Sequence, residues 1–143
     1  MNETVEEAEL ATSLVALSHH VLQLFSCAGR AHKLTQQQVE LMCAVIVRGR
    51  VRMTDLGKLM VLEKSSLSNL VDRLERRGLA VRTRDPDDRR ATWVELTSEG
   101  TELAMRTHRE VTARLDGLIN RLPSKDQRRL SAVVRTLMAE ENP

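Results

Sequence analysis

The sequence predicts a mainly α-helical protein that carries one small β-hairpin. Aromatic residues are nearly absent, with one Phe, one Trp and no Tyr among 143 residues. The core must therefore be built from Leu, Val, Ala and Met, a composition that favours helices. Apolar residues recur at spacings of three and four through most of the chain. Residues 79–84 and 91–97 instead alternate in polarity around a charged turn at 85–90, as hairpin strands do.

The first helix is expected over about residues 4–28. An apolar stripe runs along it from Leu10 at helical spacing. The helix is longer than a small domain needs for its own core, and such a stripe near a terminus often packs on a partner subunit. A second helix is expected to begin after Thr35, which forms a capping box with Gln38, and to end near Val47.

The centre of the chain has a helix-turn-helix pattern. A short extended piece at 51–53 precedes a brief helix over 55–60, for which Thr54 is the expected N-cap. The next helix is expected over 65–78, where Gly78 should adopt the left-handed conformation that ends it. Its apolar stripe consists of Leu67, Leu70, Val71 and Leu74. Because the hairpin follows at once, the pattern predicts a winged helix.

Two further helices are expected after the hairpin. Thr97 and Ser98 cap the first of them, and Pro123 separates it from the last, which begins at Ser124. Both carry apolar stripes at helical spacing. The predicted helices at the two ends of the chain therefore flank a central winged helix.

The charge distribution points to a polyanionic partner. Residues 48–97 hold 12 Lys and Arg against 8 Asp and Glu, whereas residues 1–47 hold 2 against 5. The positive excess thus lies around the predicted winged helix. The sequence has no Gly-rich phosphate loop, nucleophile elbow or HExxH motif, so no enzyme activity and no cofactor are expected.

The location of the protein is expected to be cytoplasmic, with no membrane partner. No apolar run is expected to reach the length of a membrane span, and the acidic N-terminus is unlike a signal peptide. Cys27 and Cys43 are expected to be buried free thiols in that compartment. No metal site is expected, because the adjacent His19 and His20 point about 100° apart on a helix.

Three segments of the sequence carry a resemblance to a known family. The hairpin reads Asp85-Pro86-x-Asp88-x-Arg90 and then Val94-x-Leu96-Thr97-x-x-Gly100. The helix before it reads Leu67-x-x-Leu70-Val71-Asp72-Arg73-Leu74-Glu75-x-x-Gly78-Leu79-x-x-Arg82, and the second helix opens with Leu34-Thr35-x-x-Gln38. With the order of the elements, these motifs resemble the MarR family of bacterial transcription regulators.

The resemblance implies one domain over residues 1–143. Its fold is mainly α with a small β-hairpin wing. A winged helix-turn-helix at about 35–97 is flanked by N- and C-terminal dimerisation helices at about 4–28 and 98–140. The implied function is that of a sequence-specific DNA-binding transcription regulator. More narrowly, it implies a homodimeric repressor of a pseudo-palindromic operator, relieved by a small-molecule effector.

The resemblance also assigns roles to individual residues. It gives base contacts in the major groove to Ser65, Ser66, Ser68, Asn69 and Arg73, phosphate contacts to Thr54 and Lys64, and a minor-groove contact to Arg90, with Asp88 orienting it and Arg89 near the DNA backbone. A narrow minor groove has an enhanced negative potential that attracts an arginine.

The candidate effector site lies outside this surface, and two alternative functions are also considered. The candidate effector contacts, between the dimer helices and the winged helix, are His20, Leu24, Cys27 and Met42. One alternative is a thiol-based redox-sensing regulator that uses Cys27. The other is a winged-helix protein-interaction module that does not read DNA.

Overall fold

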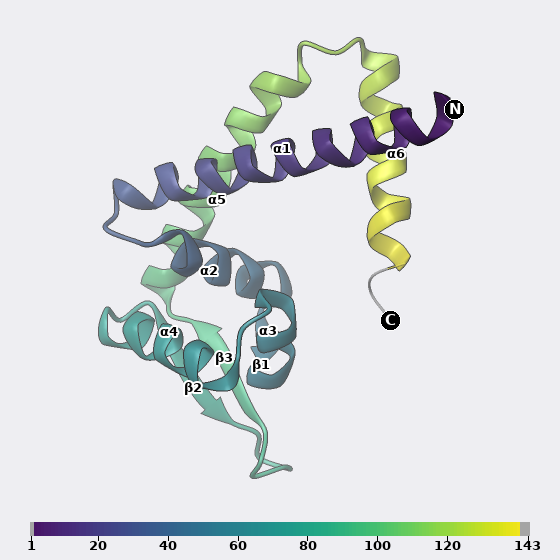
Figure 1. The fold of residues 1–143 in the computed structure, drawn as a ribbon. Coiled ribbons are helices and arrows are strands. Elements are labelled where there is room, and N and C mark those ends of the chain that lie inside the picture. The colour runs from purple at the N-terminus through teal and green to yellow at the C-terminus, as the bar shows by residue number, and fades with distance from the viewer. Residues whose placement is uncertain (1, 141–143) are drawn as a thin grey trace. The chain divides into compact units, whose positions relative to one another are not determined.

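The computed structural model describes the backbone of residues 2–140 and the side chains of residues 8–139. It divides into two compact units, Met1–Val111 and Thr112–Pro143, which are described separately. The elements, drawn in Figure 1, are α1 (Asn2–Arg30), α2 (Gln36–Arg48), β1 (Arg50–Arg52), α3 (Met53–Met60), α4 (Lys64–Arg76), β2 (Ala80–Arg84), β3 (Thr92–Leu96), α5 (Ser98–Ile119) and α6 (Ser124–Glu140). The predicted fold class, mainly helical with a small β wing, is confirmed.

The start of α2 confirms the predicted capping box. The backbone N–H of Gln38 donates to Thr35 Oγ1 at 3.2 Å, and the N–H of Thr35 donates to Gln38 Oε1 at 2.9 Å. Two backbone donors that the helix leaves without partners are thereby satisfied.

The start of α3 corrects a prediction. The helix begins at Met53 with Arg52 as its N-cap residue, and no side chain caps it. Thr54 therefore lies inside the first turn and is not the N-cap. The reason is tertiary, because Arg52 is still paired with Trp93 in the sheet and the end of that strand sets where the helix can begin.

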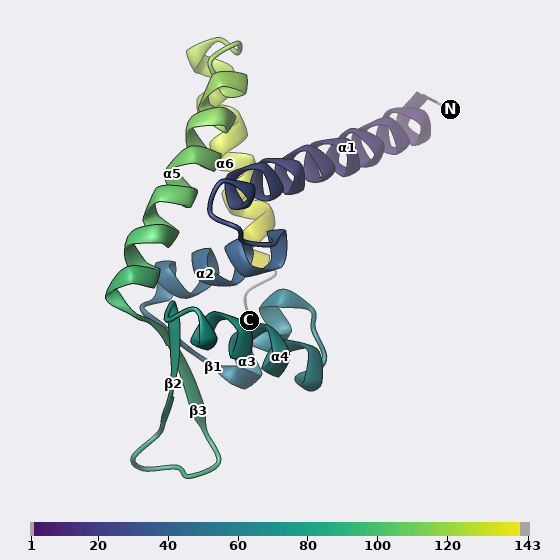
Figure 2. The same ribbon diagram turned by 90° about the vertical axis from the view of Figure 1, so that its left-hand side faces the viewer.

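The sheet contains three antiparallel strands in the order β1-β3-β2. The predicted hairpin is present, and Figure 2 shows it extending away from the helices of the first unit. β1 pairs along β3, so that Val51 lies opposite Val94. Both of these side chains are buried and fix one face of the sheet against the helices.

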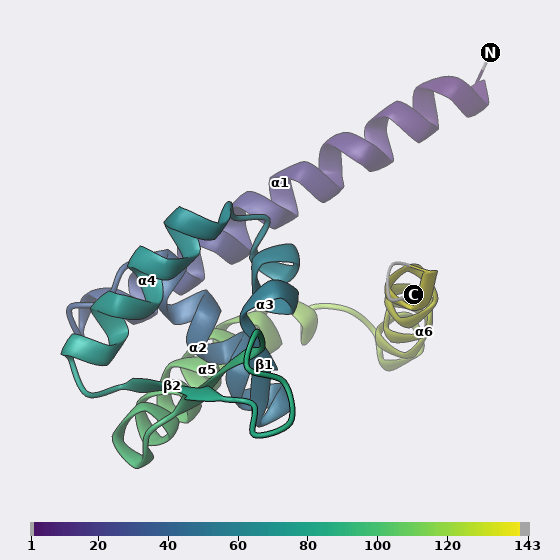
Figure 3. The same ribbon diagram turned by 90° about the horizontal axis from the view of Figure 1, so that it is seen from below.

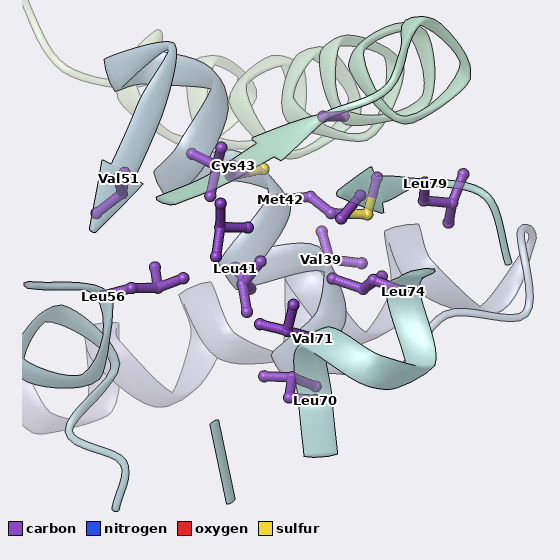
Figure 4. Packing of buried hydrophobic residues seen from close by; sticks show 14 of the residues in the cluster. Val39, Leu41, Met42, Cys43, Val51, Leu56, Leu70, Val71, Leu74 and Leu79 are labelled. Carbon is purple, nitrogen blue, oxygen red and sulfur yellow. The ribbon is translucent and has the colours of Figure 1, made fainter. Parts of the chain in front are cut away.

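The core of the first unit is aliphatic. Figure 4 shows side chains from α2, α4 and the strands meeting around Leu41, Met42, Val71 and Leu74, which are fully buried. Burying each such side chain stabilises the fold by about 1.5–3 kcal/mol. The core thus holds α4 from one side and leaves its opposite face exposed.

The end of α4 is tied to two neighbouring segments. Gly78 has φ of +70°, as predicted, and the N–H groups of Gly78 and Leu79 close the helix on the carbonyls of Glu75 and Leu74. Arg77 donates to the carbonyl oxygens of Lys33 at 2.8 Å and His32 at 2.9 Å in the α1–α2 connection. The C-terminus of α4 is therefore fixed to the α1–α2 connection.

The N-terminal half of α1 is exposed. Residues 8–20 are all exposed, and Figure 3 shows this half extending beyond the rest of the first unit. Within Ala8–Arg30, a window of 18 residues has a mean hydropathy of 1.3, so by length and composition alone it could cross a membrane. The expectation that no apolar run reaches this length is too strong for α1. Composition of this kind also occurs in helices that pack against protein, so it is weak evidence for a span.

The second unit contains the end of α5 and all of α6. α5 ends at Ile119, a few residues before Pro123, because the chain turns there through bonds from Arg121 to Leu118 and from Leu122 to Ile119. The large apolar side chains of α6 are about half exposed, namely Leu130, Val133, Val134, Leu137 and Met138.

Candidate nucleic-acid interface

The candidate interface is centred on α4. Leu67, Leu70, Val71 and Leu74 are at most 7% exposed and face the core, as the spacing predicted. The opposite face carries the polar side chains. Glu63, the N-cap residue, makes no capping hydrogen bond, so the first backbone N–H groups of α4 are not satisfied by that side chain.

A groove of about 950 Å³ separates α4 from the wing. Its walls come from the end of β1, α3, the α3–α4 connection, the start of α4, and the strands and turn of the wing. Five of the ten residues predicted to contact DNA line it: Thr54, Lys64, Ser68, Asp88 and Arg90. The structure therefore brings together residues that are 36 positions apart in the chain.

The groove carries more basic than acidic side chains. Its cationic side chains are those of Arg52, Lys58, Lys64, Arg82 and Arg90, and its acidic ones are those of Glu63 and Asp88. This excess of positive charge suits a polyanion, because basic side chains that meet phosphates release condensed counterions.

The other predicted DNA contacts lie outside this groove. Ser65, Ser66, Asn69, Arg73 and Arg89 are not among its lining residues. Four of them lie on α4 and Arg89 lies in the wing turn. Ser68 differs from these residues of α4, since its hydroxyl and carbonyl oxygens both accept hydrogen bonds from Arg82.

Arg82 of β2 holds α4 in place, a role that sequence reasoning missed. Its guanidinium contacts the carboxylates of Asp72, at 2.7 Å, and Glu75, and it reaches the Ser68 carbonyl at 2.9 Å. Burial alone would lower the pKa of Arg82, but the hydrogen bonds to Asp72 and Glu75 outweigh it and raise that pKa. The helical spacing of Asp72 and Glu75 was the available signal, since residues three apart share a helix face.

The wing tip is shaped by aspartate side chains. Asp88 Oδ1 accepts from the backbone N–H of Arg90 at 3.0 Å, and Asp85 Oδ1 accepts from that of Asp87 at 3.0 Å. Such turns fix the backbone locally. Asp88 thus positions the backbone of Arg90, whose side chain is exposed and lines the groove.

The wing base contains a second cluster that sequence reasoning missed. The Trp93 indole N–H donates to Asp85 Oδ2 at 3.1 Å, and the guanidinium groups of Arg50 and Arg52 lie 4.1 and 4.9 Å from the ring centroid. The N–H groups of Asp87 and Trp93 hold the pKa of Asp85 below its ordinary value. Both arginines come from β1, which pairs with β3. The sequence analysis did not predict this pairing, and so it missed the cluster.

The cysteines differ from each other. Cys43 is buried, and burial raises the pKa of its thiol more than a hydrogen bond with Thr107 lowers it. A raised pKa disfavours the reactive thiolate. Cys27 is exposed, so the expectation of two buried thiols is wrong for this residue.

The four candidate effector contacts have unlike surroundings. Met42 and Leu24 are buried, whereas His20 and Cys27 are exposed on α1. None of the four lines the groove beside α4. Within the described residues, no cluster of His, Cys, Asp and Glu could hold a metal ion.

The fold and site together define a winged helix-turn-helix protein with a basic groove between α4 and the wing. The MarR family model matches residues 34–92, which include α2, α3, α4 and most of the wing. The HTH-type transcriptional regulator FarR of Neisseria gonorrhoeae is 32% identical over 85 residues, which cover 59% of this chain and 58% of FarR. That match spans less than two thirds of the relative's length.

Solved structures share the fold over nearly the whole chain. NadR in complex with 4-hydroxyphenylacetate is 25% identical, with a TM-score of 0.80 over 92% of this chain and 90% of that one. A mutant of MarR from E. coli, complexed with operator DNA, has a TM-score of 0.71 at 21% identity and covers 96% of both chains. Residues 34–92 of the chain therefore match the MarR family, and the chain shares the fold of the solved MarR structure. The relatives that match are transcription regulators and not enzymes.

Proposed function

We propose that the protein is a sequence-specific DNA-binding transcription regulator of the cytoplasm. The observation that carries this proposal is the basic groove between α4 and the wing, where Lys64, Ser68 and Arg90 converge. An α-helix fits the major groove of duplex DNA, and a slim arginine-bearing hairpin fits the minor groove. The MarR structure with operator DNA has the same fold.

The proposed DNA contacts are of two kinds: some read the bases, and others contact the phosphate backbone and position the protein. Polar side chains on α4 (Ser65, Ser66, Asn69 and Arg73) face base edges in the major groove, and Ser68 lies at the edge of this set. Thr54 and Lys64 contact phosphates at the groove wall. Arg90 enters the minor groove with Asp88 holding its backbone, and Arg89 lies near the DNA backbone.

The functional form is a homodimer in which the two units form a single domain. The support is the large apolar side chains left exposed on α1 and, separately, on α6, since monomeric proteins rarely expose large apolar patches. A dimer would present two copies of α4 to two half-sites of a pseudo-palindromic operator. We propose that it acts as a repressor.

A small-molecule effector is proposed to relieve repression. The structural relative NadR was solved with 4-hydroxyphenylacetate bound, which supports a small organic ligand. His20, Leu24, Cys27 and Met42 remain the candidate contacts. A ligand can release DNA only if its affinity differs between the two arrangements of the recognition helices.

Arg90→Ala tests the proposed function. Binding to the DNA upstream of the protein's own gene is titrated at several salt concentrations for the wild type, Arg90→Ala and Arg106→Ala. Arg106 is an exposed arginine of α5 paired with Glu102, so its loss changes the net charge equally. We expect Arg90→Ala to lose about 1–3 kcal/mol per half-site and Arg106→Ala to bind like the wild type.

Weak binding to all DNA, alike for the three proteins, would contradict DNA reading. That result would favour the winged-helix protein-interaction module.

A redox-sensing regulator is a second candidate because Cys27 is exposed. In that case an oxidant would abolish DNA binding by the wild type and spare Cys27→Ser. An equal response of both proteins would exclude Cys27 as the sensor.

A further inference from the structure

Val61 has a backbone conformation that a β-branched side chain disfavours. It forms the C-cap of α3 with φ of 52° and ψ of 48°, in the left-handed region. A β-branched side chain is a genuine outlier there, because its branches crowd the backbone. The turn enforces the conformation, since the N–H groups of Val61 and Leu62 close α3 on the carbonyls of Lys58 and Gly57 at 3.3 and 3.0 Å.

Burial does not explain the choice of valine. The side chain of Val61 is 88% exposed, more than any of the exposed apolar side chains on α1 or α6. Glycine and asparagine are the residues that suit a left-handed helix end. Neither local conformation nor core packing therefore favours valine at this position.

The position of Val61 indicates what it contacts. It lines the groove beside α4 together with Thr54, Lys64 and Ser68, in the turn that leads into the helix. It is a highly exposed apolar group in a groove whose charged side chains are mainly basic. The matching apolar group on the edge of duplex DNA is the 5-methyl group of thymine in the major groove.

We propose that Val61 is a specificity-determining residue that packs against a thymine methyl group in each half-site. This inference rests on the proposed function, because it needs the groove to bind duplex DNA. The strained backbone is retained because it holds the side chain at the DNA surface.

The test combines a protein variant with a change in the DNA. The fragment upstream of the protein's own gene is synthesised with dTTP or with dUTP, which lacks the methyl group. Wild type, Val61→Gly, Val47→Ala and Arg90→Ala are titrated against both fragments. Val47 is the control, since it is an apolar side chain of α2 that is 71% exposed and does not line the groove.

The expected result is weaker binding to the uracil fragment by every protein that keeps Val61. Wild type and Val47→Ala should bind the uracil fragment about 4-fold more weakly per half-site, hence about 15-fold for two half-sites, the scale of one buried methyl group. Arg90→Ala should bind both fragments weakly but show the same uracil penalty. Val61→Gly should bind both fragments alike within about 2-fold.

Thermal unfolding separates this contact from a folding defect. Asparagine tolerates the left-handed conformation better than valine, so Val61→Asn should raise the Tm by about 2–4 °C. A lower Tm for both Val61→Asn and Val61→Gly would overturn the account of strain.

An equal uracil penalty for wild type and Val61→Gly would overturn the thymine contact. If Arg90→Ala weakens binding but the wild type binds the thymine and uracil fragments equally, this inference alone is overturned. A wild type that binds all DNA alike, with no effect of Arg90→Ala, would overturn the proposed function as well.

Discussion

Arg82 shows how a single side chain sets the geometry of a binding surface. It extends from β2 to Asp72, Glu75 and Ser68 on α4, so one guanidinium connects the wing to the helix that precedes it. Arginine suits this role because its planar group carries five donors in a fixed arrangement. The position of α4 relative to the wing therefore depends on a residue that need not touch DNA.

Arg82→Lys should destabilise the protein and weaken DNA binding together. A lysine ammonium cannot satisfy two carboxylates and the Ser68 carbonyl in the same geometry. The expected loss is about 1–2 kcal/mol of unfolding free energy in urea, because the side chain is a quarter exposed and its ion pairs are partly screened. Arg84→Lys, on the same strand, is the control, and equal losses for both variants would argue against the connection.

Asp85 makes the wing base sensitive to acid. Its pKa is lowered, so its contribution to stability is present above the ordinary carboxyl range and is lost as the pH falls through the lowered value. Trp93, the only tryptophan, should keep its fluorescence from pH 8 to about 4 and change below that. Asp85→Asn should lack this transition, whereas a change near pH 6 would point to another group.

Sequence reasoning at this scale succeeded where the signal was local. The capping box of Thr35 and Gln38 and the left-handed Gly78 depend on a few neighbouring residues, and both are confirmed. Thr54 was misassigned because a strand pairing with a distant segment decides where α3 begins. The DNA contacts themselves stay predictions, although half of them line one groove.

At the scale of elements, the start of α5 is fixed by close contact with the end of α4. Thr97 Oγ1 accepts from the N–H of Gly100 at 3.0 Å and donates to the carbonyl of Gly78 at 2.6 Å. Gly100 packs directly on the segment after α4, and a Cβ at this position would lie 1.9 Å from the carbonyl oxygen of Leu79. The start of the helix that leaves the wing is therefore held against the segment that follows α4.

Gly100→Ala should lower the unfolding free energy by about 3 kcal/mol, because backbone atoms must move to admit the methyl group. Gly117→Ala is the control on the same helix, where a Cβ meets nothing within 4 Å. It should stabilise the protein by about 0.5–1 kcal/mol. Denaturation of both variants in urea gives the comparison, and two similar values would contradict the close packing.

The helices and strands were more predictable than the contacts between them. Helical spacing and alternation gave the order of helices and the hairpin, because these patterns repeat along the chain. The pairing of β1 with β3 and the Trp93 cluster that it creates depend on contacts between segments about 40 residues apart. No local pattern encodes such contacts.

At the scale of the whole molecule, the exposed apolar side chains matter most. Leu10, Leu14 and Leu17 on α1 are about half exposed, as are the apolar side chains of α6. Burying them between two copies would remove this surface from water and supply the main driving force for association. The dimer, in turn, would fix the separation of the two copies of α4.

The most direct test of the account is a footprint on the DNA upstream of the protein's own gene. We expect two protected half-sites related by two-fold symmetry, with centres about 10 base pairs or a multiple of that apart, and two chains per site. Leu17→Glu, which places a charge on the exposed face of α1, should abolish this paired protection. A single protected stretch occupied by one chain, or uniform protection of any DNA, would contradict a dimer that reads two half-sites.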